Sequence, residues 1–287
     1  MNGQYGRKKK LRARYRLSVV FFGTVLIFGL IFYSYMKSVT LEDVLSQDRS
    51  ITFFNHGSDQ EGQNGGDDQS GGESSDGGVE SAPVVNPVPE GERQDDSYFD
   101  DCVFIGDSIT YGLSSYGVIP SSNVLASVSM SIARAETEKI DTSFGSMTVL
   151  EALGEINPKN IYIMLGSNGA AYTSPADMYQ NYQAFLNKIR TACPDSELYI
   201  ISAPPVTKNK ENSAESPIKN ADLDELNSKL LGYAGANGVR YLDLNSALKD
   251  DTGCMPDNYA ENDGMHFKFS TYSIFTDYIL THVAVKG

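Results

Sequence analysis

Five short apolar stretches in residues 98–287 constrain the fold most, because each has the length of one strand and helical patterns lie between them. The predicted strands are residues 102–106, 124–128, 160–165, 197–202 and 239–242. The predicted helices are residues 131–140, 148–156, 175–192, 222–236 and 271–285. Alternating strands and helices indicate a parallel sheet with helices on both faces. We therefore predict one α/β domain with a five-stranded parallel sheet. Residues 98–287 are numerous enough to form a well-buried core.

The sharpest local pattern is the apolar run of residues 103–105, which stops at Gly106-Asp107-Ser108. This pattern predicts a buried strand, a tight turn and a helix that starts near Ser108. Open α/β sheets bind ligands at the carboxyl ends of their strands, and a helix N-terminus favours negative charge there. Asp and Ser are also ordinary helix N-caps, so the triplet alone does not indicate catalysis.

A second motif lies near the end of the chain, where Asp263 precedes His266 by three residues. A serine nucleophile needs a base, and that base needs a group that fixes its tautomer and stabilises its cation. The other two histidines, His56 and His282, have no acid at this spacing. We therefore predict Ser108, His266 and Asp263 as the catalytic residues.

Together these motifs resemble the SGNH, or GDSL-type, hydrolases. Gly106-Asp107-Ser108 matches the first block of that family, Gly166-Ser167-Asn168 the third, and Asp263 with His266 the last. The resemblance runs from about residue 99 to the C-terminus in the order of the family's blocks. It implies a three-layer α/β/α, flavodoxin-like fold and a serine ester hydrolase that needs no cofactor and no metal.

The resemblance also implies an oxyanion hole formed by the backbone N–H of Ser108, a donor in the second block and the side-chain amide of Asn168. The second block normally contributes a glycine N–H, and Ser129 is the aligned residue here. Only the backbone of Ser129 is expected to donate, although a serine would be strained there if the position required a positive φ. Gly166 and Asp107 are expected to border the bound substrate, with Asp107 acting mainly as support for the turn.

The N-terminal part predicts a membrane anchor. Residues 1–16 carry seven Lys and Arg and no acid, and residues 17–36 form a twenty-residue stretch without a charge. Such a stretch spans the hydrocarbon core as a helix, and the basic tail stays in the cytoplasm. A cleavable signal peptide is the alternative, but the apolar run is longer than its hydrophobic region and no small-residue cleavage site follows.

Residues 37–97 predict a connection between the membrane and the domain. A short juxtamembrane segment leads into a stretch rich in Gly, Ser, acids and then Pro, which cannot bury a core and is expected to be a disordered tether. The domain of residues 98–287 would then lie outside the cell. The chain would be a single-pass membrane protein with a cytoplasmic N-terminus.

Charge and cysteine content exclude some functions. The part from residue 98 onward has 23 acids against 13 Lys and Arg, which argues against nucleic acid as a partner, because phosphate binding needs a basic surface. The three cysteines, Cys102, Cys193 and Cys254, do not match a zinc site. A disulfide between Cys193 and Cys254 stays open.

The function expected from these features is an extracellular, membrane-anchored serine esterase that acts on an acylated small molecule or glycan. An O-acetyl ester of a cell-envelope glycan fits the predicted location and the reach of the tether. Two alternatives stay open: an O-acyltransferase that uses the same three residues, and a glycan-binding module without catalytic activity. The sequence does not determine the acyl chain length.

Overall fold

The computed structural model describes residues 84–214 and 218–284. The predicted basic tail, the transmembrane helix of residues 17–36 and most of the linker lie outside these residues. Within the described ranges, no helix is both long enough and apolar enough to cross a bilayer.

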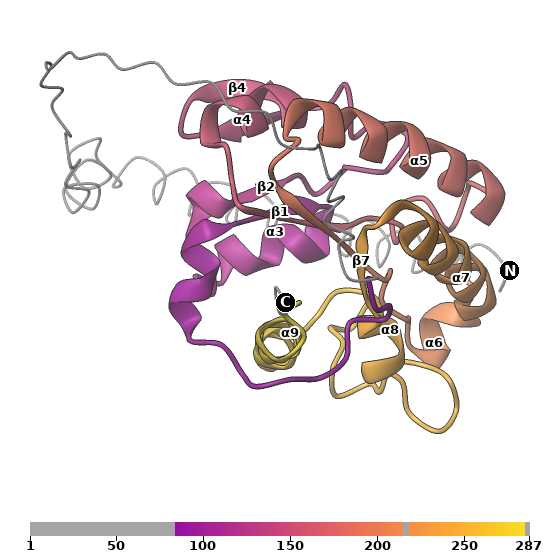
Figure 1. The fold of residues 1–287 in the computed structure, drawn as a ribbon. Helices are drawn as coiled ribbons and strands as arrows, with labels where there is room; N and C mark the ends of the chain where they lie inside the picture. Colours follow the sequence, from indigo (N-terminus) through magenta and orange to yellow (C-terminus); the bar gives the residue numbers. More distant parts are fainter. Residues whose placement is uncertain (1–83, 215–217, 285–287) are drawn as a thin grey trace, which may run out of the picture. The chain divides into compact units, whose positions relative to one another are not determined.

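A five-stranded parallel sheet forms the centre of the described domain (Figure 1), which confirms the predicted sheet. Its strand order is β2-β1-β5-β6-β7. The strands are β1 (Cys102–Gly106), β2 (Val124–Ala126), β5 (Asn160–Met164), β6 (Glu197–Ile201) and β7 (Arg240–Leu242). Because β1 and β5 are neighbours and all strands run the same way, the segments that follow Gly106 and Met164 emerge at the same edge of the sheet.

Helices cover both faces of the sheet (Figure 1). One buried cluster joins the sheet to α4 (Val149–Ile156), α5 (Pro175–Ala192) and α7 (Asn220–Asn237). The other joins it to α3 (Ser108–Ser115), α8 (Leu244–Ala247) and α9 (Phe269–Thr281). The short helix α6 (Lys208–Glu211) and the 3₁₀ turns η1 (Asp96–Asp101) and η2 (Ser121–Asn123) complete the described elements. This is the three-layer arrangement that the sequence resemblance implies.

Successive side chains of each strand point to opposite faces, so the buried strands supply both cores. On β1, Val103 and Ile105 belong to the first cluster, and Phe104 belongs to the second. Phe104 is in register with Tyr162 on β5, and Tyr162 with Tyr199 on β6. These three rings are stacked, with centroids 5.1 and 4.4 Å apart.

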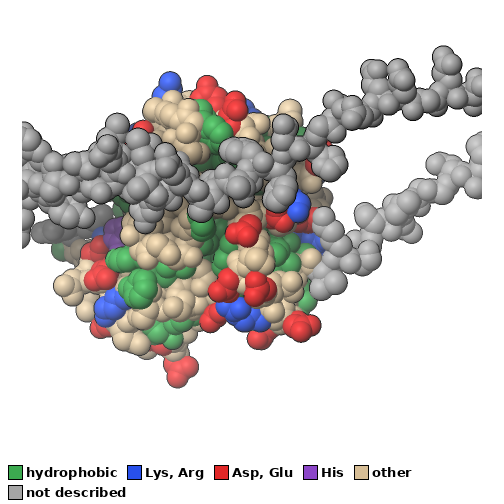
Figure 2. Space-filling view, turned by 90° about the vertical axis from the view of Figure 1, so that its left-hand side faces the viewer, with side chains coloured by type: hydrophobic (Ala, Val, Ile, Leu, Met, Phe, Trp, Pro, Cys, Tyr) green, Lys and Arg blue, Asp and Glu red, His purple; other side chains and the backbone are tan. Residues whose placement is uncertain are grey.

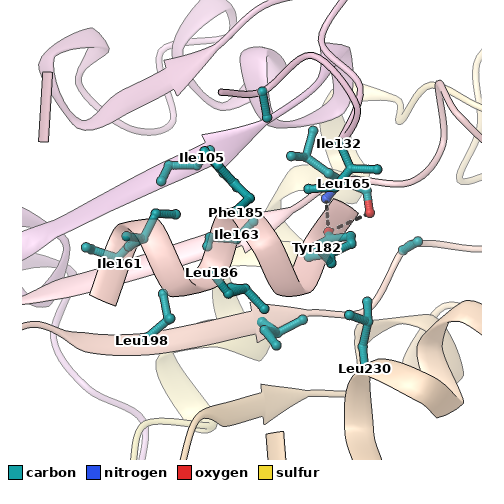
Figure 3. Packing of buried hydrophobic residues seen from close by; sticks show 14 of the residues in the cluster. Ile105, Ile132, Ile161, Ile163, Leu165, Tyr182, Phe185, Leu186, Leu198 and Leu230 are labelled. Carbon is teal, nitrogen blue, oxygen red and sulfur yellow. Dashed lines mark hydrogen bonds between the residues drawn. The ribbon is translucent and has the colours of Figure 1, made fainter. Parts of the chain in front are cut away.

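Figure 3 shows how the first cluster fixes the end of β5. Tyr182 of α5 is fully buried among Ile163, Leu186 and their neighbours. Its hydroxyl donates to the backbone O of Leu165 at 2.7 Å and accepts from the N–H of the same residue at 2.8 Å. The core therefore holds the segment that leads from β5 into Gly166-Ser167-Asn168.

The predicted helix of residues 131–140 is wrong. Residues 132–137 form turns, and an antiparallel hairpin of β3 (Lys139–Thr142) and β4 (Gly145–Thr148) follows. Along β3 the buried Ile140 alternates with the exposed Lys139 and the outward-facing Asp141, which is a strand pattern. Ile132 and Ala135 are buried at a helical spacing, which explains why the sequence favoured a helix.

Residues 84–97 fall within the range predicted as tether, and the structure gives them contacts with the domain. Asn86 donates from Nδ2 to the O of Val239 at 2.7 Å and accepts from the N–H of Tyr241 at 2.8 Å. The N–H of Val88 donates to the O of Tyr241, and its side chain is buried in the second cluster. We call residues 84–97 the strap, and it covers the outer edge of β7.

The structure also answers whether the cysteines pair. The three cysteines are buried free thiols, so Cys193 and Cys254 are not paired.

Figure 2 shows one face of the domain, where Lys and Arg side chains lie singly or in small groups among acidic ones. The exposed ion pairs, such as Lys159 with Asp101 at 2.7 Å, add little to stability, so the two buried clusters hold the fold together.

Candidate active site

Close packing and a helix cap restrict which residue types can occupy the turn at Ser108. A Cβ on Gly106 would lie 2.0 Å from Oγ1 of Thr110 and 2.5 Å from the O of Met164, so only glycine is tolerated. Asp107 caps α3 by accepting the N–H of Ile109 at 3.1 Å. Ser108 is the first residue of α3, as predicted, and its side chain lies at the helix N-terminus. Within the described ranges, no hydrogen bond from the backbone N–H of Ser108 is present.

Asp263 and His266 lie in the loop before α9, and they form a hydrogen-bonded chain with Ser108. Nε2 of His266 is 2.8 Å from Oγ of Ser108, and Nδ1 of His266 is 2.5 Å from Oδ2 of Asp263. The other carboxylate oxygen of Asp263 accepts the N–H groups of Met265 and His266 at 2.9 and 3.0 Å. The loop therefore brings together the three residues that the sequence predicted.

Close packing fixes this loop on the sheet. Gly264 has a φ of +74°, and a Cβ there would lie 2.3 Å from Oγ1 of Thr207. The O of Gly264 accepts the N–H of Thr207 at 2.9 Å. A side chain at Gly264 would force the loop away from Thr207 and would change the approach of His266 to Ser108.

The pKa values of the two nearby carboxylates are shifted in opposite directions. Burial acts to raise the pKa of Asp263, but hydrogen bonds from the His266 ring and from two backbone N–H groups outweigh burial and bring it below its ordinary value. Burial raises the pKa of Asp107 to about 6, with smaller opposing effects from the N–H of Ile109 and the charge of His266. Asp263 therefore stays ionised beside His266.

Asn168, which follows β5, faces the segment after β2. Its Nδ2 donates to the O of Val128 at 3.1 Å and to the O of Met130 at 2.9 Å. We call residues 127–130 the 127–130 loop. Both N–H groups of the Asn168 amide therefore hold this loop beside the N-terminus of α3, and in this structure neither points to an oxyanion position, which differs from the role that the resemblance implies.

Ser129 lies in the 127–130 loop without backbone strain. Asn157 is the one non-glycine residue with a positive φ in the described part of the chain, so the serine at position 129 is compatible with its backbone. The N–H of Ser129 makes a long hydrogen bond of 3.3 Å to Oγ of Ser127. Its own Oγ donates to Oε1 of Glu138 at 2.8 Å.

Asp107 and Gly166, which were expected to border the substrate, are both buried. Asp107 is 2% exposed and supports the turn. Gly166 has a φ of +147°, and a Cβ there would lie 2.8 Å from Cβ of Ala203. In this structure both residues shape the backbone beneath the site and offer no side chain to a substrate.

A groove of about 530 Å³ lies between α3, the 127–130 loop and β3, and its lining includes Tyr111 and Ser127 but not Ser108, Asn168 or His266. Tyr111, which is 44% exposed, lies on the helix face one turn after Ser108. The remaining lining of the groove is mixed. Its polar side chains include Ser114, Ser115, Ser127, Lys139 and Asp141, and its apolar ones are Val124, Ala126, Val128 and Ile140.

One residue at the site, Glu138, was not found from the sequence, because it lay in the segment wrongly predicted as a helix. Its carboxylate faces the 127–130 loop across the turns of residues 132–137. A glutamate in an apparently amphipathic helix reads as a solvated side chain, so no sequence signal pointed to this contact.

The family model of GDSL-like lipases and acylhydrolases matches residues 104–273, which is more than half of the chain and includes Ser108, Asn168 and His266. The chain belongs to this family. A GDSL-like acylhydrolase cleaves ester bonds, so this protein is an ester hydrolase.

Solved structures similar to this acylhydrolase have low sequence identity. A GDSL-like lipase from Bacteroides thetaiotaomicron is 17% identical, covers 66% of this chain and 89% of its own, and has a TM-score of 0.49. A lipase/acylhydrolase from Enterococcus faecalis is 17% identical over 62% of this chain and 93% of its own, with a TM-score of 0.42. A carbohydrate esterase family 3 protein from Talaromyces cellulolyticus is 15% identical over 62% and 93%, with a TM-score of 0.46. No curated protein matches the chain.

Proposed function

We propose that the protein hydrolyses O-acetyl esters of cell-envelope glycans through a Ser108–His266–Asp263 mechanism. The single observation that carries the proposal is the hydrogen-bonded chain from Asp263 through His266 to Ser108, with contacts of 2.5 and 2.8 Å. A binding module without turnover would not need this chain of bonds, because binding requires neither a base nor an ionised carboxylate behind it.

In the first half-reaction, Oγ of Ser108 attacks the ester carbonyl carbon while Nε2 of His266 accepts the hydroxyl proton. Asp263 accepts a hydrogen bond from the Nδ1–H of His266 and stabilises the imidazolium cation that forms. The tetrahedral oxyanion forms near the N-terminus of α3, where the N–H of Ser108 and a donor from the 127–130 loop stabilise it, and Asn168 holds that loop in place through its two amide bonds. His266 then donates its proton to the leaving alcohol, and the acetyl group stays on Ser108.

In the second half-reaction, water attacks the acetyl group of Ser108. His266 accepts a proton from this water, and it returns that proton to Oγ of Ser108 when acetic acid leaves. The cycle consumes one water, releases one alcohol and one acetic acid, which then loses its proton to solvent, and regenerates the serine. Within the protein, the proton transfers involve only Ser108 and His266.

The groove between α3, the 127–130 loop and β3 supports a carbohydrate as the alcohol part of the ester. An exposed tyrosine offers its ring face to a sugar ring, and the serine hydroxyls with Lys139 and Asp141 match sugar hydroxyls as donors and acceptors. A long fatty acyl chain would instead need a continuous apolar wall. These properties favour a short acyl group on a polar alcohol.

The extracellular location is part of the same proposal, and it rests on the basic residues 1–16 and the uncharged residues 17–36. Protease added to intact cells should release the domain into the medium. Release of this fragment only after lysis would contradict the proposed topology.

The test of the activity uses the full-length protein in detergent, with aryl acetate, butyrate and octanoate esters and with O-acetylated cell-wall glycan fragments. We expect the acetate ester to be cleaved fastest and the glycan to release free acetate, with Ser108→Ala inactive in both assays. If no ester is cleaved, the proposed hydrolysis is wrong. Transfer of acetate to an added sugar in preference to water would instead assign the protein as an acyltransferase.

A further inference from the structure

Behind the 127–130 loop lies a buried carboxylate that the mechanism above does not use. The side chain of Glu138 is 7% exposed. Its Oε1 accepts the hydroxyl of Ser127 at 2.6 Å and the hydroxyl of Ser129 at 2.8 Å. Its Oε2 lies 3.2 Å from the guanidinium of Arg134, so the two side chains form an ion pair. This Oε2 atom accepts no well-formed hydrogen bond.

Burying a carboxylate is costly unless other groups bond it, and hydrogen bonds to a charged acceptor are stronger than neutral ones. In the described part of the chain, the hydrogen-bond donors to Glu138 are the two serine hydroxyls of the loop. The carboxylate and the loop therefore stabilise each other. If the loop moved away, the buried Glu138 carboxylate would lose both serine hydrogen bonds and would keep only its ion pair with Arg134.

The same loop is also held by Asn168, which bonds the backbone O of Val128 and of Met130. A third contact joins the N–H of Ser127 to the O of Gly106 at 3.3 Å, next to the turn that carries Ser108. The position of the loop relative to Ser108 is therefore set by its bonds to Glu138, to Asn168 and to Gly106.

We propose that Glu138 is a positioning residue, which holds the 127–130 loop so that one backbone N–H of the loop can donate to the oxyanion formed at Ser108. This inference rests on the proposed hydrolysis and adds to it the residue that holds the loop in which Ser129 stands at the position of the family's second-block glycine. The hydroxyl of Ser129 points to Glu138, so it orients the backbone and does not itself bind the oxyanion. Glu138 does not touch the substrate.

Positioning has a kinetic signature that separates it from substrate binding. The oxyanion exists only in the transition state, so a misplaced donor lowers kcat and leaves KM nearly unchanged. We expect Glu138→Ala in the full-length protein to lower kcat for an aryl acetate about 10- to 100-fold, which is less than the 10²–10³-fold loss of a donor itself. Affinity for an alkylboronic acid, which forms a charged tetrahedral adduct with serine, should fall in parallel with kcat.

Glu138→Gln should recover much of the activity, because an amide oxygen can still accept both hydroxyls. The matched control is Glu136→Ala, which removes the same charge two positions earlier from a surface pair with Lys188 and should leave kcat unchanged. A double Ser127→Ala, Ser129→Ala variant should lose kcat to a similar extent. Adding Glu138→Ala to that double variant should cause little further loss, because all three residues act through the same contacts.

Circular dichroism at the assay temperature identifies the fraction of each variant that is folded, so kcat is expressed per folded molecule. A wild-type kcat and boronic-acid affinity in folded Glu138→Ala would overturn this inference alone, with the ester hydrolysis unaffected. A loss confined to KM would also overturn it. Absence of ester hydrolysis in the wild type would overturn both this inference and the proposed function.

Discussion

Oγ of Ser108 lies 2.8 Å from Nε2 of His266, although the two residues are 158 positions apart in the sequence. On the other side of the ring, Nδ1 faces the ionised carboxylate of Asp263. A carboxylate accepts and does not donate, so the proton of neutral His266 is held on Nδ1 and Nε2 is left as the acceptor for the serine proton. The neighbours of the ring thus select the tautomer that general-base catalysis requires.

This relationship predicts the effect of removing either residue. Ser108→Ala and His266→Ala should each lower kcat for an aryl acetate by at least about 10³-fold, and the double variant should be barely worse than either single one. His282→Ala is the control, because the ring of His282 bonds Thr281 and Tyr278 at the end of α9, and its loss should leave kcat unchanged. Steady-state kinetics measure kcat of each variant, and full activity in Ser108→Ala would refute Ser108 as the nucleophile.

Asn168→Ala should lower kcat about 10- to 100-fold with little change in KM, because the Asn168 amide holds the loop that carries an oxyanion donor through its bonds to Val128 and Met130. Asn123→Ala is a matched control, because Asn123 also donates its amide to backbone oxygens, those of Phe99 and Cys102, but at the other end of the strands. That variant should lower the melting temperature and leave kcat of the folded protein unchanged. Equal kinetic losses in the two variants would indicate a purely structural role for Asn168.

Substitutions of Ser129 separate the backbone from the side chain. Ser129→Pro deletes the N–H and should be strongly damaging. Ser129→Ala keeps that N–H and the Ser127 bond to Glu138, so its kcat should fall only a few-fold. Ser129→Gly should not activate the enzyme, because the position has no positive φ to relieve. A proline variant with wild-type kcat would show that the loop donor is another N–H group.

The buried carboxylate of Asp107 predicts a pH-dependent stability. Its pKa is raised from 3.8 to about 6, so the folded state holds the proton more tightly, and the contribution of this group to stability decreases as the pH rises from about 4 to 6. A rise of this size corresponds to roughly 3 kcal/mol at most. Asp107→Asn keeps an oxygen for the Ile109 N–H and should therefore raise the free energy of unfolding at pH 7.

At pH 4 the same substitution should have little effect, because Asp107 is then protonated in the folded state. Urea denaturation of both proteins at the two pH values measures the difference. Equal stability of wild type and variant at pH 7 would mean that the burial of this charge carries no cost.

The strap predicts a stability difference between two neighbouring valines. Val88 is 4% exposed and Val85 is 61% exposed. Val88→Ala should lower the free energy of unfolding by about 1–3 kcal/mol, and Val85→Ala should have no measurable effect. A domain that starts at residue 98 loses both valines and the Asn86 bonds to β7, so it should melt below one that starts at residue 84. Identical melting curves for the two domains would show that the strap does not contribute.

The sequence predicted the parts of the fold that depend on local pattern. The apolar run before Gly106 identified a strand of the parallel sheet and the turn at its carboxyl end. The spacing of Asp263 and His266 identified the loop that lies beside this turn. The β3–β4 hairpin was missed because Ile132 and Ala135 have helical spacing, and tertiary packing overrode that pattern. The contact of Glu138 with Ser127 spans eleven positions across an irregular turn, so no periodicity marks it.

The stacked rings of Phe104, Tyr162 and Tyr199 have a consequence for how this protein can be observed. The chain contains no tryptophan, so its near-ultraviolet signals come from tyrosine and phenylalanine. Rings stacked across three neighbouring strands and fixed in a dry core give a strong near-ultraviolet dichroism, which vanishes when the strands separate. Loss of this contribution therefore follows the separation of β1, β5 and β6, without any label or engineered probe.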